Sequence, residues 1–303
     1  MILCCGEALI DMIPAKTATG EDAYIPRPGG AVFNTAIALG RLGAPAGFLS
    51  GVSTDPFGEK LAATLAAEKV DASRLIRSDR PTTLAIVHLR DGSATYSFHD
   101  EGSAGRMISA DDAIDPPEAA KTLFFGGISL VAEPAADAYA EMLARWRTGR
   151  VVMIDPNVRP AFIRDEARYR ARLSAMFALS DVVKVSDEDL AWLTDGDDIE
   201  TGAREILGAG PATVIVTEGA KGATAFTETG AFSVPARRIE CVDTVGAGDT
   251  FNAGFLAALA ERGALRRNPG EEDLKAALAL GVSAASVVCT RVGAEPPRRE
   301  DLT

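Results

Sequence analysis

The residues best suited to chemistry lie in one glycine-rich segment, residues 243–255, which reads DTVGAGDTFNAGF. Gly246 and Gly248 have no Cβ, so the backbone around them can turn tightly and approach a ligand. Apolar residues recur at helical spacing from Phe251 onward, which predicts a helix whose first N–H groups face the glycine turn. Converging N–H groups at a helix N-terminus stabilise a phosphoryl group. Gly246, Ala247 and Gly248 are therefore predicted to form an anion hole.

Asp249 follows this glycine turn directly. A carboxylate there can accept the proton of a substrate hydroxyl while the anion hole stabilises charge on the transferred group. The plainer alternative is an aspartate that only caps the helix. The flanking Asp243 and the long context of residues 244–255 favour phosphoryl transfer, so Asp249 is the predicted catalytic base.

Two common nucleotide-binding motifs do not occur in the sequence. There is no G-x-x-x-x-G-K-[ST], and residues 219–222 (GAKG) do not have that spacing. No G-x-G-x-x-G follows the first predicted strand, where residues 5–8 read CGEA. The sequence therefore disfavours P-loop kinases and dinucleotide-dependent enzymes.

Composition narrows the classes of partner. The chain has 303 residues, 47% of them hydrophobic, and a net charge of −12, which permits a large core and disfavours nucleic acid and anionic membranes. We expect no signal peptide and no transmembrane helix, and hence a cytoplasmic protein, because the N-terminus lacks a basic region and no uninterrupted apolar run reaches about 18 residues. The only histidines, His88 and His99, exclude a histidine-rich metal site. The four cysteines do not match zinc spacing, and we expect buried, reduced thiols.

Strands and helices alternate along the chain, which predicts an α/β fold with a mainly parallel sheet covered on both faces. Residues 82–98 break this rhythm and read as a hairpin with a turn at Asp91-Gly92, which predicts a protruding β-flap. No linker or repeat divides the chain, so we expect a single domain over residues 1–303.

The predicted strands are residues 2–10, 48–52, 123–125, 151–154, 182–185 and 214–216, with a β-rich piece at 224–240. The predicted helices are residues 31–42, 60–69, 134–146, 169–179, 250–262 and 272–287.

Two distant segments carry a family resemblance. Residues 243–255 resemble the C-terminal signature of the ribokinase-like sugar kinases, also called the PfkB family. Residues 29–36 (GGAVFNTA) and 41–43 (RLG) resemble its N-terminal block. The resemblance spans essentially the whole chain. It implies a three-layer α/β/α ribokinase-like fold, a small β-lid formed by about 12–28 and 82–106, and an enzyme that uses ATP and Mg²⁺.

On the sugar side, the resemblance implies that Asp11, Gly29, Gly30 and Asn34 contact the acceptor. Residues 155–160 (DPNVRP) resemble the family's D-x-N-x-R segment. This implies that Arg159 reaches sugar or phosphoryl oxygens, for which its planar fork is suited.

Phe98, on the flap, bears on the choice of sugar. The surrounding residues resemble those of fructokinases, in which an aromatic lid residue packs on the sugar. In 2-keto-3-deoxygluconate kinases, the residues at the same place resemble the pattern Tyr-x-Arg. An apolar ring offers no partner to a buried carboxylate, so a neutral ketose is favoured. Arg106 and Arg159 could still serve a sugar acid, and Phe98 could also be a plain core residue of the hairpin.

On the nucleotide side, residues 184–189 (KVSDED) resemble the family's N-x-x-E motif, which organises magnesium and phosphate through water. Ser186 and Asp189 depart from the motif but keep oxygen ligands, and Glu188 is an alternative carboxylate. The run also fits a charged helix N-terminus. The resemblance implies nucleotide contacts from Lys184, Ser186, Thr217, Gly219, Gly222 and the anion hole, with Val282 in the adenine wall.

Some relatives bind a monovalent cation beside the anion hole. Here the resemblance implies that a K⁺ site would use the carboxylate of Asp243 and backbone carbonyls. Those carbonyls would come from Val245, Val288, Arg291 and Gly293.

Three functions follow as hypotheses. The first is a kinase that takes ATP and fructose. The second is a related kinase for 2-keto-3-deoxygluconate, ribose or a nucleoside. The third is a non-catalytic sugar or nucleotide sensor, which the intact Asp249 and glycine turn disfavour. The exposed edge of the lid is compatible with a homodimer and equally with a monomer.

Overall fold

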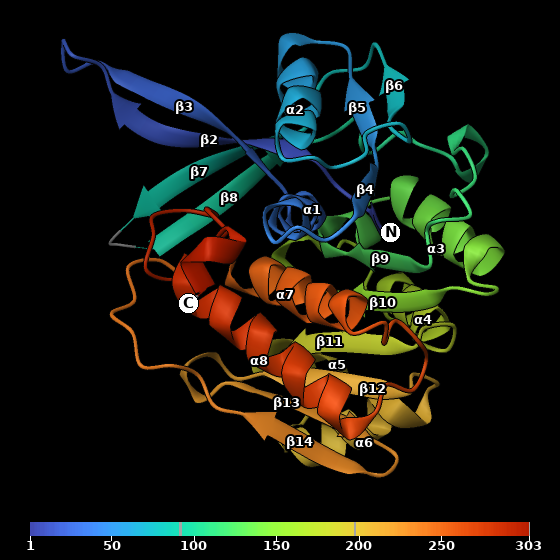
Figure 1. Ribbon diagram of the computed structural model, residues 1–303. Helices are drawn as coiled ribbons and strands as arrows, with labels where there is room; N and C mark the ends of the chain where they lie inside the picture. Colours follow the sequence, from blue (N-terminus) through green and yellow to red (C-terminus); the bar gives the residue numbers. More distant parts are fainter. Residues whose placement is uncertain (91–92, 197, 303) are drawn as a thin grey trace.

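The computed structural model describes residues 1–90, 93–196 and 198–302. Its centre is an eight-stranded sheet with the order β14-β13-β12-β11-β10-β9-β1-β4 (Figure 1). The six strands from β12 to β4 are parallel, and β13 and β14 add an antiparallel edge. Their bounds are β1 Ile2–Cys5, β4 Ala46–Leu49, β9 Thr122–Gly126, β10 Val151–Asp155, β11 Val182–Ser186, β12 Thr213–Thr217, β13 Ala223–Thr227 and β14 Gly230–Val234.

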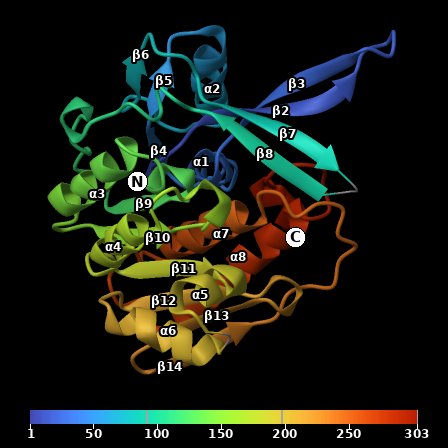
Figure 2. The ribbon, with the colours of Figure 1, turned by 180° about the vertical axis from the view of Figure 1, so that it is seen from behind.

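Helices cover both faces of this sheet, because its parallel strands are apolar on both sides. On one face, α1 (Ala31–Arg41), α7 (Ala247–Glu261) and α8 (Glu271–Val288) share a buried core with α2 (Pro56–Ala67). On the other face, seen in Figure 2, α3 (Ala135–Trp146), α4 (Glu166–Phe177), α5 (Asp187–Thr194) and α6 (Ile199–Gly208) pack over a second core. The predicted three-layer α/β/α architecture is confirmed.

A second, four-stranded sheet projects from one end of the molecule (Figure 1). It has the order β3-β2-β7-β8, with β2 Leu9–Lys16, β3 Asp22–Gly29, β7 Leu84–Arg90 and β8 Ser93–His99. We call it the small sheet. Strands β7 and β8 pair antiparallel, which confirms the predicted hairpin, whereas the predicted turn at Asp91-Gly92 lies outside the described residues.

Two predicted strands are each split in the structure. The strand predicted over residues 2–10 is wrong as one element, since β1 ends at Cys5 in the central sheet and β2 begins at Leu9 in the small sheet. A Cβ on Gly6 would lie 2.5 Å from a methyl carbon of Val32, so the chain passes tightly under α1 there. Residues 48–52 likewise divide between β4 and β5 (Gly51–Ser53), which pairs with β6 (Ile76–Ser78).

The remaining elements are short 3₁₀ turns. They are Ala110–Asp112, Gly127–Leu130, Pro160–Phe162, Gly219–Lys221 and Arg299–Leu302. Within the described ranges, none of the helices has the length and apolar character needed to cross a bilayer.

Candidate active site

The N-terminus of α7 lies at the centre of the candidate site. The helix begins at Ala247, and its N-cap residue Gly246 has φ 77°, a left-handed conformation that favours glycine. A Cβ on Gly246 would also lie 2.7 Å from the Cβ of Ala294, so a side chain has no room there. Asp249 falls in the first turn of the helix with only 8% of its surface exposed. The glycine turn therefore brings a buried carboxylate to the N-terminus of α7, where the N–H of Ala247 donates to the carbonyl oxygen of Thr244 at 3.2 Å.

Asp249 is held by α1 from the opposite side. The Nδ2 of Asn34 donates a hydrogen bond of 2.9 Å to Asp249 Oδ2, and Thr35 Oγ1 donates one of 3.2 Å to its carbonyl oxygen. Burial raises the pKa of Asp249 to about 7; the Asn34 hydrogen bond opposes this rise, and the charge of Asp155 adds to it. A carboxyl group with a pKa near neutrality is well matched to take up a hydroxyl proton.

A buried ion pair lies beneath the glycine turn. Lys184 Nζ is 3.1 Å from Asp155 Oδ2, and both side chains are about 95% buried. Asn252, one turn after Asp249, donates a 2.7 Å hydrogen bond to the same oxygen. A Cβ on Gly248 would lie 3.2 Å from Lys184 Nζ, so the ammonium group sits directly against the turn. This places a positive charge beside the N-terminus of α7.

A largely apolar cavity of about 640 Å³ opens beside the same turn, between α8, the N-terminus of α7 and the β12–β13 connection. Its volume is in the range of small-molecule and cofactor sites. The cavity brings together six residues that the sequence assigned to the nucleotide: Thr217, Gly219, Gly222, Ala247, Gly248 and Val282. Lys184, Ser186 and Gly246 are not in its wall.

The cavity wall also holds two cysteines, Cys241 and Cys289. Cys4 and Cys5 are buried in β1, as expected, but Cys241 is exposed and Cys289 is only half-buried. The expectation that all four thiols are buried is therefore wrong. Residue 241 lies in an irregular connection after β14 rather than in an apolar strand. Burial raises the pKa of Cys289 to about 11, and the adjacent Cys241 thiol adds to the rise.

The predicted sugar residues converge where β2, β3 and α1 meet. The Asp11 carboxylate lies over Gly29, since a Cβ on that glycine would be 2.1 Å from Asp11 Oδ2. Burial raises the pKa of Asp11 to about 6. Gly30 is the N-cap of α1 with φ 108°, and a Cβ there would lie 2.9 Å from the carbonyl oxygen of Glu7. The tight turn at Gly30 directs Asn34 toward Asp249.

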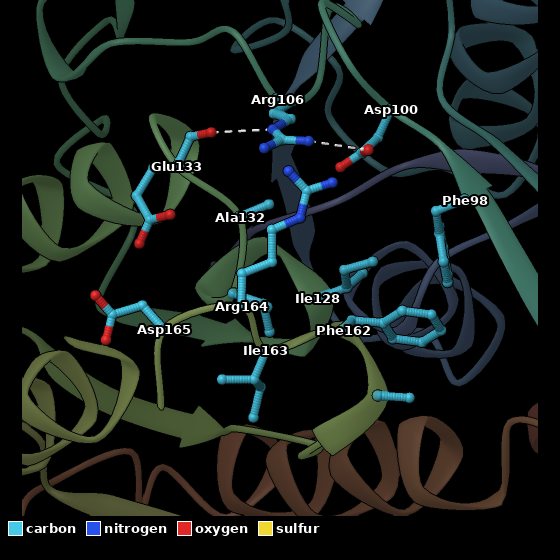
Figure 3. Close-up of a pocket in the computed structure, with 12 residues that line it drawn as sticks. Phe98, Asp100, Arg106, Ile128, Ala132, Glu133, Phe162, Ile163, Arg164 and Asp165 are labelled. Carbon is cyan, nitrogen blue, oxygen red and sulfur yellow. Dashed lines mark hydrogen bonds and ion pairs between the residues drawn. The ribbon is translucent and has the colours of Figure 1, made fainter. Parts of the chain in front are cut away.

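Phe98 contacts an aromatic ring that the sequence did not indicate. Its ring meets that of Phe162 edge to face, with 4.7 Å between centroids, and lies 6.4 Å from that of Tyr96. Figure 3 shows Phe98 and Phe162 at one side of a cavity of about 200 Å³. At the far side, Arg106 donates hydrogen bonds of 3.0 Å to both Asp100 and the carbonyl oxygen of Glu133. The Arg106 guanidinium group is thus already paired.

Arg159 is exposed on the loop after β10, where its Nη1 donates to the carbonyl oxygen of Val158.

Ser186 and Asp189 form a capping box at the start of α5. The other oxygen of Asp189 accepts a 3.0 Å hydrogen bond from the N–H of Val158, so this carboxylate fastens the ends of β10 and β11 together. Glu188, the alternative carboxylate, is exposed.

Asp243 joins two loops. Its Oδ1 accepts from the N–H of Val245 at 3.0 Å, and its Oδ2 accepts from the N–H of Gly293 at 2.8 Å. The segment before α7 and the segment after α8 therefore lie side by side. This contact brings the loops that carry Val245, Arg291 and Gly293 together at the end of α8, whose last residue is Val288.

Glu7 is a site residue that sequence reasoning missed. It sits between β1 and β2, and its Oε1 accepts hydrogen bonds from the N–H groups of Ala31 (2.8 Å) and Val32 (3.4 Å). Its Oε2 accepts a third from Ser129 at 3.2 Å. Glu7 thus caps the N-terminus of α1, the helix that presents Asn34 to Asp249. Burial raises the pKa of Glu7, while these donors oppose the rise.

We expect Glu7→Gln to lower the free energy of unfolding by about 2 kcal/mol, because hydrogen bonds to a charged group are lost in a buried place. We also expect a lower kcat, since α1 would no longer hold Asn34 firmly. Thermal unfolding and steady-state kinetics would measure both effects. Glu118→Gln is the matched control, because Glu118 is exposed and outside this network. Wild-type stability in Glu7→Gln would refute this role.

Comparison with known proteins shows the family to which this chain belongs. The pattern described as pfkB family carbohydrate kinase matches residues 1–301. A fructokinase from Rhizobium leguminosarum bv. trifolii is 49% identical over 259 residues, which cover 86% of this chain and 79% of that protein. A fructokinase from Xylella fastidiosa, solved with bound ATP, superposes with a TM-score of 0.89 at 26% identity, covering 99% of this chain and 96% of that one.

A fructokinase from Vibrio cholerae O395, solved with fructose, ADP and calcium, gives a TM-score of 0.85 at 28% identity over 99% of this chain and 97% of that one. A double mutant of it was solved with fructose, ADP and potassium. Both signatures expected from the sequence lie within the matched range. The chain belongs to the pfkB family of carbohydrate kinases.

Proposed function

We propose that this protein transfers the γ-phosphoryl group of ATP to a hydroxyl of fructose, with Asp249 as the base. The relative that is 49% identical is a fructokinase, and fructokinases are among the solved structures that superpose on the chain. The family is one of carbohydrate kinases, and an aminoimidazole riboside kinase from Salmonella enterica also superposes on the chain, so the remaining choice is which acceptor. The features around Phe98 and Arg106 bear on that choice.

One observation carries the proposal: Asp249 stands between the two predicted substrate regions. On one side, the glycine turn borders the cavity that we assign to ATP. On the other side, Asn34 joins Asp249 to the Asp11–Gly29–Gly30 corner that we assign to the sugar. A hydroxyl held at this corner would give its proton to Asp249 as it attacks phosphorus. The α7 N–H groups and Lys184 would stabilise charge on the transferred group.

The aromatic contact favours a neutral sugar. Phe98 and Phe162 present apolar rings, which cannot compensate a carboxylate taken out of water. Arg106, a half-buried cation of the same cavity, is paired with Asp100 and with the carbonyl oxygen of Glu133. A sugar acid that used Arg106 as its partner would have to break that pairing, whereas the exposed Arg164 lines the same cavity. Fructose needs no such change.

A panel of acceptors tests the proposal. The purified protein would be assayed for ADP release from MgATP with fructose, 2-keto-3-deoxygluconate, ribose, glucose and adenosine. We expect the highest kcat/KM for fructose. A preference for the keto acid would overturn the argument from Phe98 and keep the kinase. Binding of ATP without ADP formation from any acceptor would instead favour a sensor.

Magnesium is proposed to enter with ATP rather than to occupy a protein cage. Among residues 1–90, 93–196 and 198–302, no cluster of three or more acidic, histidine or cysteine groups could hold an ion by itself. Asp155 is paired with Lys184, and both oxygens of Asp189 accept backbone N–H groups. This donor set fits a hydrated ion held mainly by phosphate oxygens, with Asp189 reached through water. Bound there, the ion would neutralise phosphate charge.

Potassium is proposed to stabilise the paired loops around Asp243. The oxygens of Asp243 hold the N–H groups of Val245 and Gly293, which leaves backbone carbonyls of the two loops as donors for a cation. We expect turnover several-fold higher in KCl than in NaCl at equal ionic strength, and a higher Tm in KCl. Asp243→Asn should remove both differences. Equal rates and equal Tm values in the two salts would contradict a potassium site.

A further inference from the structure

The exposed and half-buried cysteines lie on segments that are fastened together. Cys241 is in the connection between β14 and α7, and Cys289 is the C-cap residue of α8. The N–H groups of Val242 and Asp243 both donate to the carbonyl oxygen of Cys289, at 2.8 and 3.3 Å. These two bonds hold the backbone next to Cys241 against the backbone of Cys289.

The two side chains also point into the same space. Both line the cavity assigned to ATP, together with Val282, Ala285 and Ser286 on the same face of α8. The Cys241 Sγ donates to the carbonyl oxygen of Asp243 at 3.8 Å, and the nearby Cys241 thiol adds to the raised pKa of Cys289. Cys241 is exposed, so an oxidant in solvent can reach it. Neighbouring sulfurs with one accessible member are the arrangement of a redox-responsive pair.

We propose that Cys241 and Cys289 form a disulfide under mild oxidation and thereby constrict the nucleotide cavity. The oxidant is hydrogen peroxide. Cys241 sulfur attacks one peroxide oxygen, the O–O bond breaks, and a sulfenic acid and water form. Cys289 sulfur then displaces the sulfenic oxygen as a second water. Two thiols are oxidised to one disulfide, and one hydrogen peroxide is reduced to two waters.

The bond would alter the cavity wall. A disulfide brings its sulfurs to about 2.05 Å, closer than any contact between two thiols. The connection before α7 would be drawn toward α8 and fixed there. This connection leads to Asp243 and the glycine turn, so the change acts on the room for ATP while leaving the sugar corner in place. The effect on ATP rests on the proposed function, but formation of the bond does not.

Mass spectrometry of tryptic peptides from the full-length protein tests whether the disulfide forms. After treatment with hydrogen peroxide, alkylation and tryptic digestion without reductant, peptides 239–262 and 276–291 should be joined. Free thiols measured in denaturant should fall from four per chain to two. Peptide 1–16, with the buried Cys4 and Cys5, is the internal control and should stay reduced. Cys241→Ser and Cys289→Ser should each abolish the joined peptides.

Peroxide should also raise the KM for ATP several-fold in the wild-type protein, and dithiothreitol should restore it. In Cys241→Ser the KM for ATP should be the same before and after peroxide treatment, whatever its value. Four free thiols after treatment, or a Cys241 sulfinic acid without joined peptides, would overturn the proposal. Because the joined peptides are detected without any turnover, this result is separate from failure of the kinase assignment.

Discussion

Replacing Asp249 with asparagine or alanine is expected to lower kcat for fructose phosphorylation by about 10²–10⁴-fold, the usual contribution of a general base. Asparagine keeps the shape and the contact with Asn34 but cannot take up a proton. The other contacts of the first turn of α7 remain, so the fold should persist. Steady-state assays on the purified variants, with circular dichroism as the check on folding, would measure this loss. Wild-type turnover in Asp249→Asn would refute the assignment of the base.

The thermal stability of Asp249→Asn provides a control that does not depend on activity. The pKa of Asp249 in the folded protein is about 7, above the ordinary value of 3.8, so the folded state binds this proton more tightly. The stability that this group contributes is fully present below pH 3.8 and is lost as pH rises through about 7. Above that pH the wild-type protein carries a buried charge that Asp249→Asn lacks. The variant should therefore have a higher Tm than the wild type at pH 8.

Lys184→Met is expected to destabilise the protein by about 3–5 kcal/mol, because it leaves the Asp155 carboxylate buried without its cation. Activity should fall as well, since the positive charge against Gly248 is removed. Urea unfolding and kinetics on the same preparation would measure both. The double variant Lys184→Met, Asp155→Asn separates the two roles.

In the double variant, a neutral amide replaces the carboxylate charge of Asp155, so most of the stability should return. The activity should not return, because the transferred phosphoryl group still lacks the ammonium charge. If the double variant recovers both, Lys184 serves the fold alone. If Lys184→Met unfolds at the wild-type urea concentration, the ion pair does not have the importance that its burial indicates.

The glycine turn at the start of α7 could be predicted from the sequence because its determinants are local. Gly246, Gly248 and Asp249 stand within four residues, and the apolar spacing that follows defines the helix. The parallel sheet was predictable for the same reason, since each strand is a short apolar run followed by a polar residue. Where only one to three residues separate two strands, as at residues 6–8 and at Ser50, the prediction joined the two strands into one.

Contacts between distant residues could not be predicted in this way. Glu7 lies 24 residues from Ala31 and 122 from Ser129, and it interrupts an apolar run in which nothing local indicates a cap. The backbone contact beside Cys241 and Cys289, and the contact of Phe98 with Phe162, also join residues that are remote along the chain. Ser186 and Asp189 show a different difficulty, because one local pattern fits two interpretations. Their spacing fits a capping box, which the structure contains, as well as the magnesium motif that stays a prediction.

The most direct test of the central claim is the pH dependence of fructose-dependent ADP release by the wild-type protein. With Asp249 as the base and its pKa at about 7, kcat/KM for fructose should rise about tenfold per pH unit below that value and level off above it. A profile that stays flat through pH 7 would contradict the assignment of Asp249. The absence of fructose-dependent ADP release at every pH would contradict the proposed fructose kinase itself.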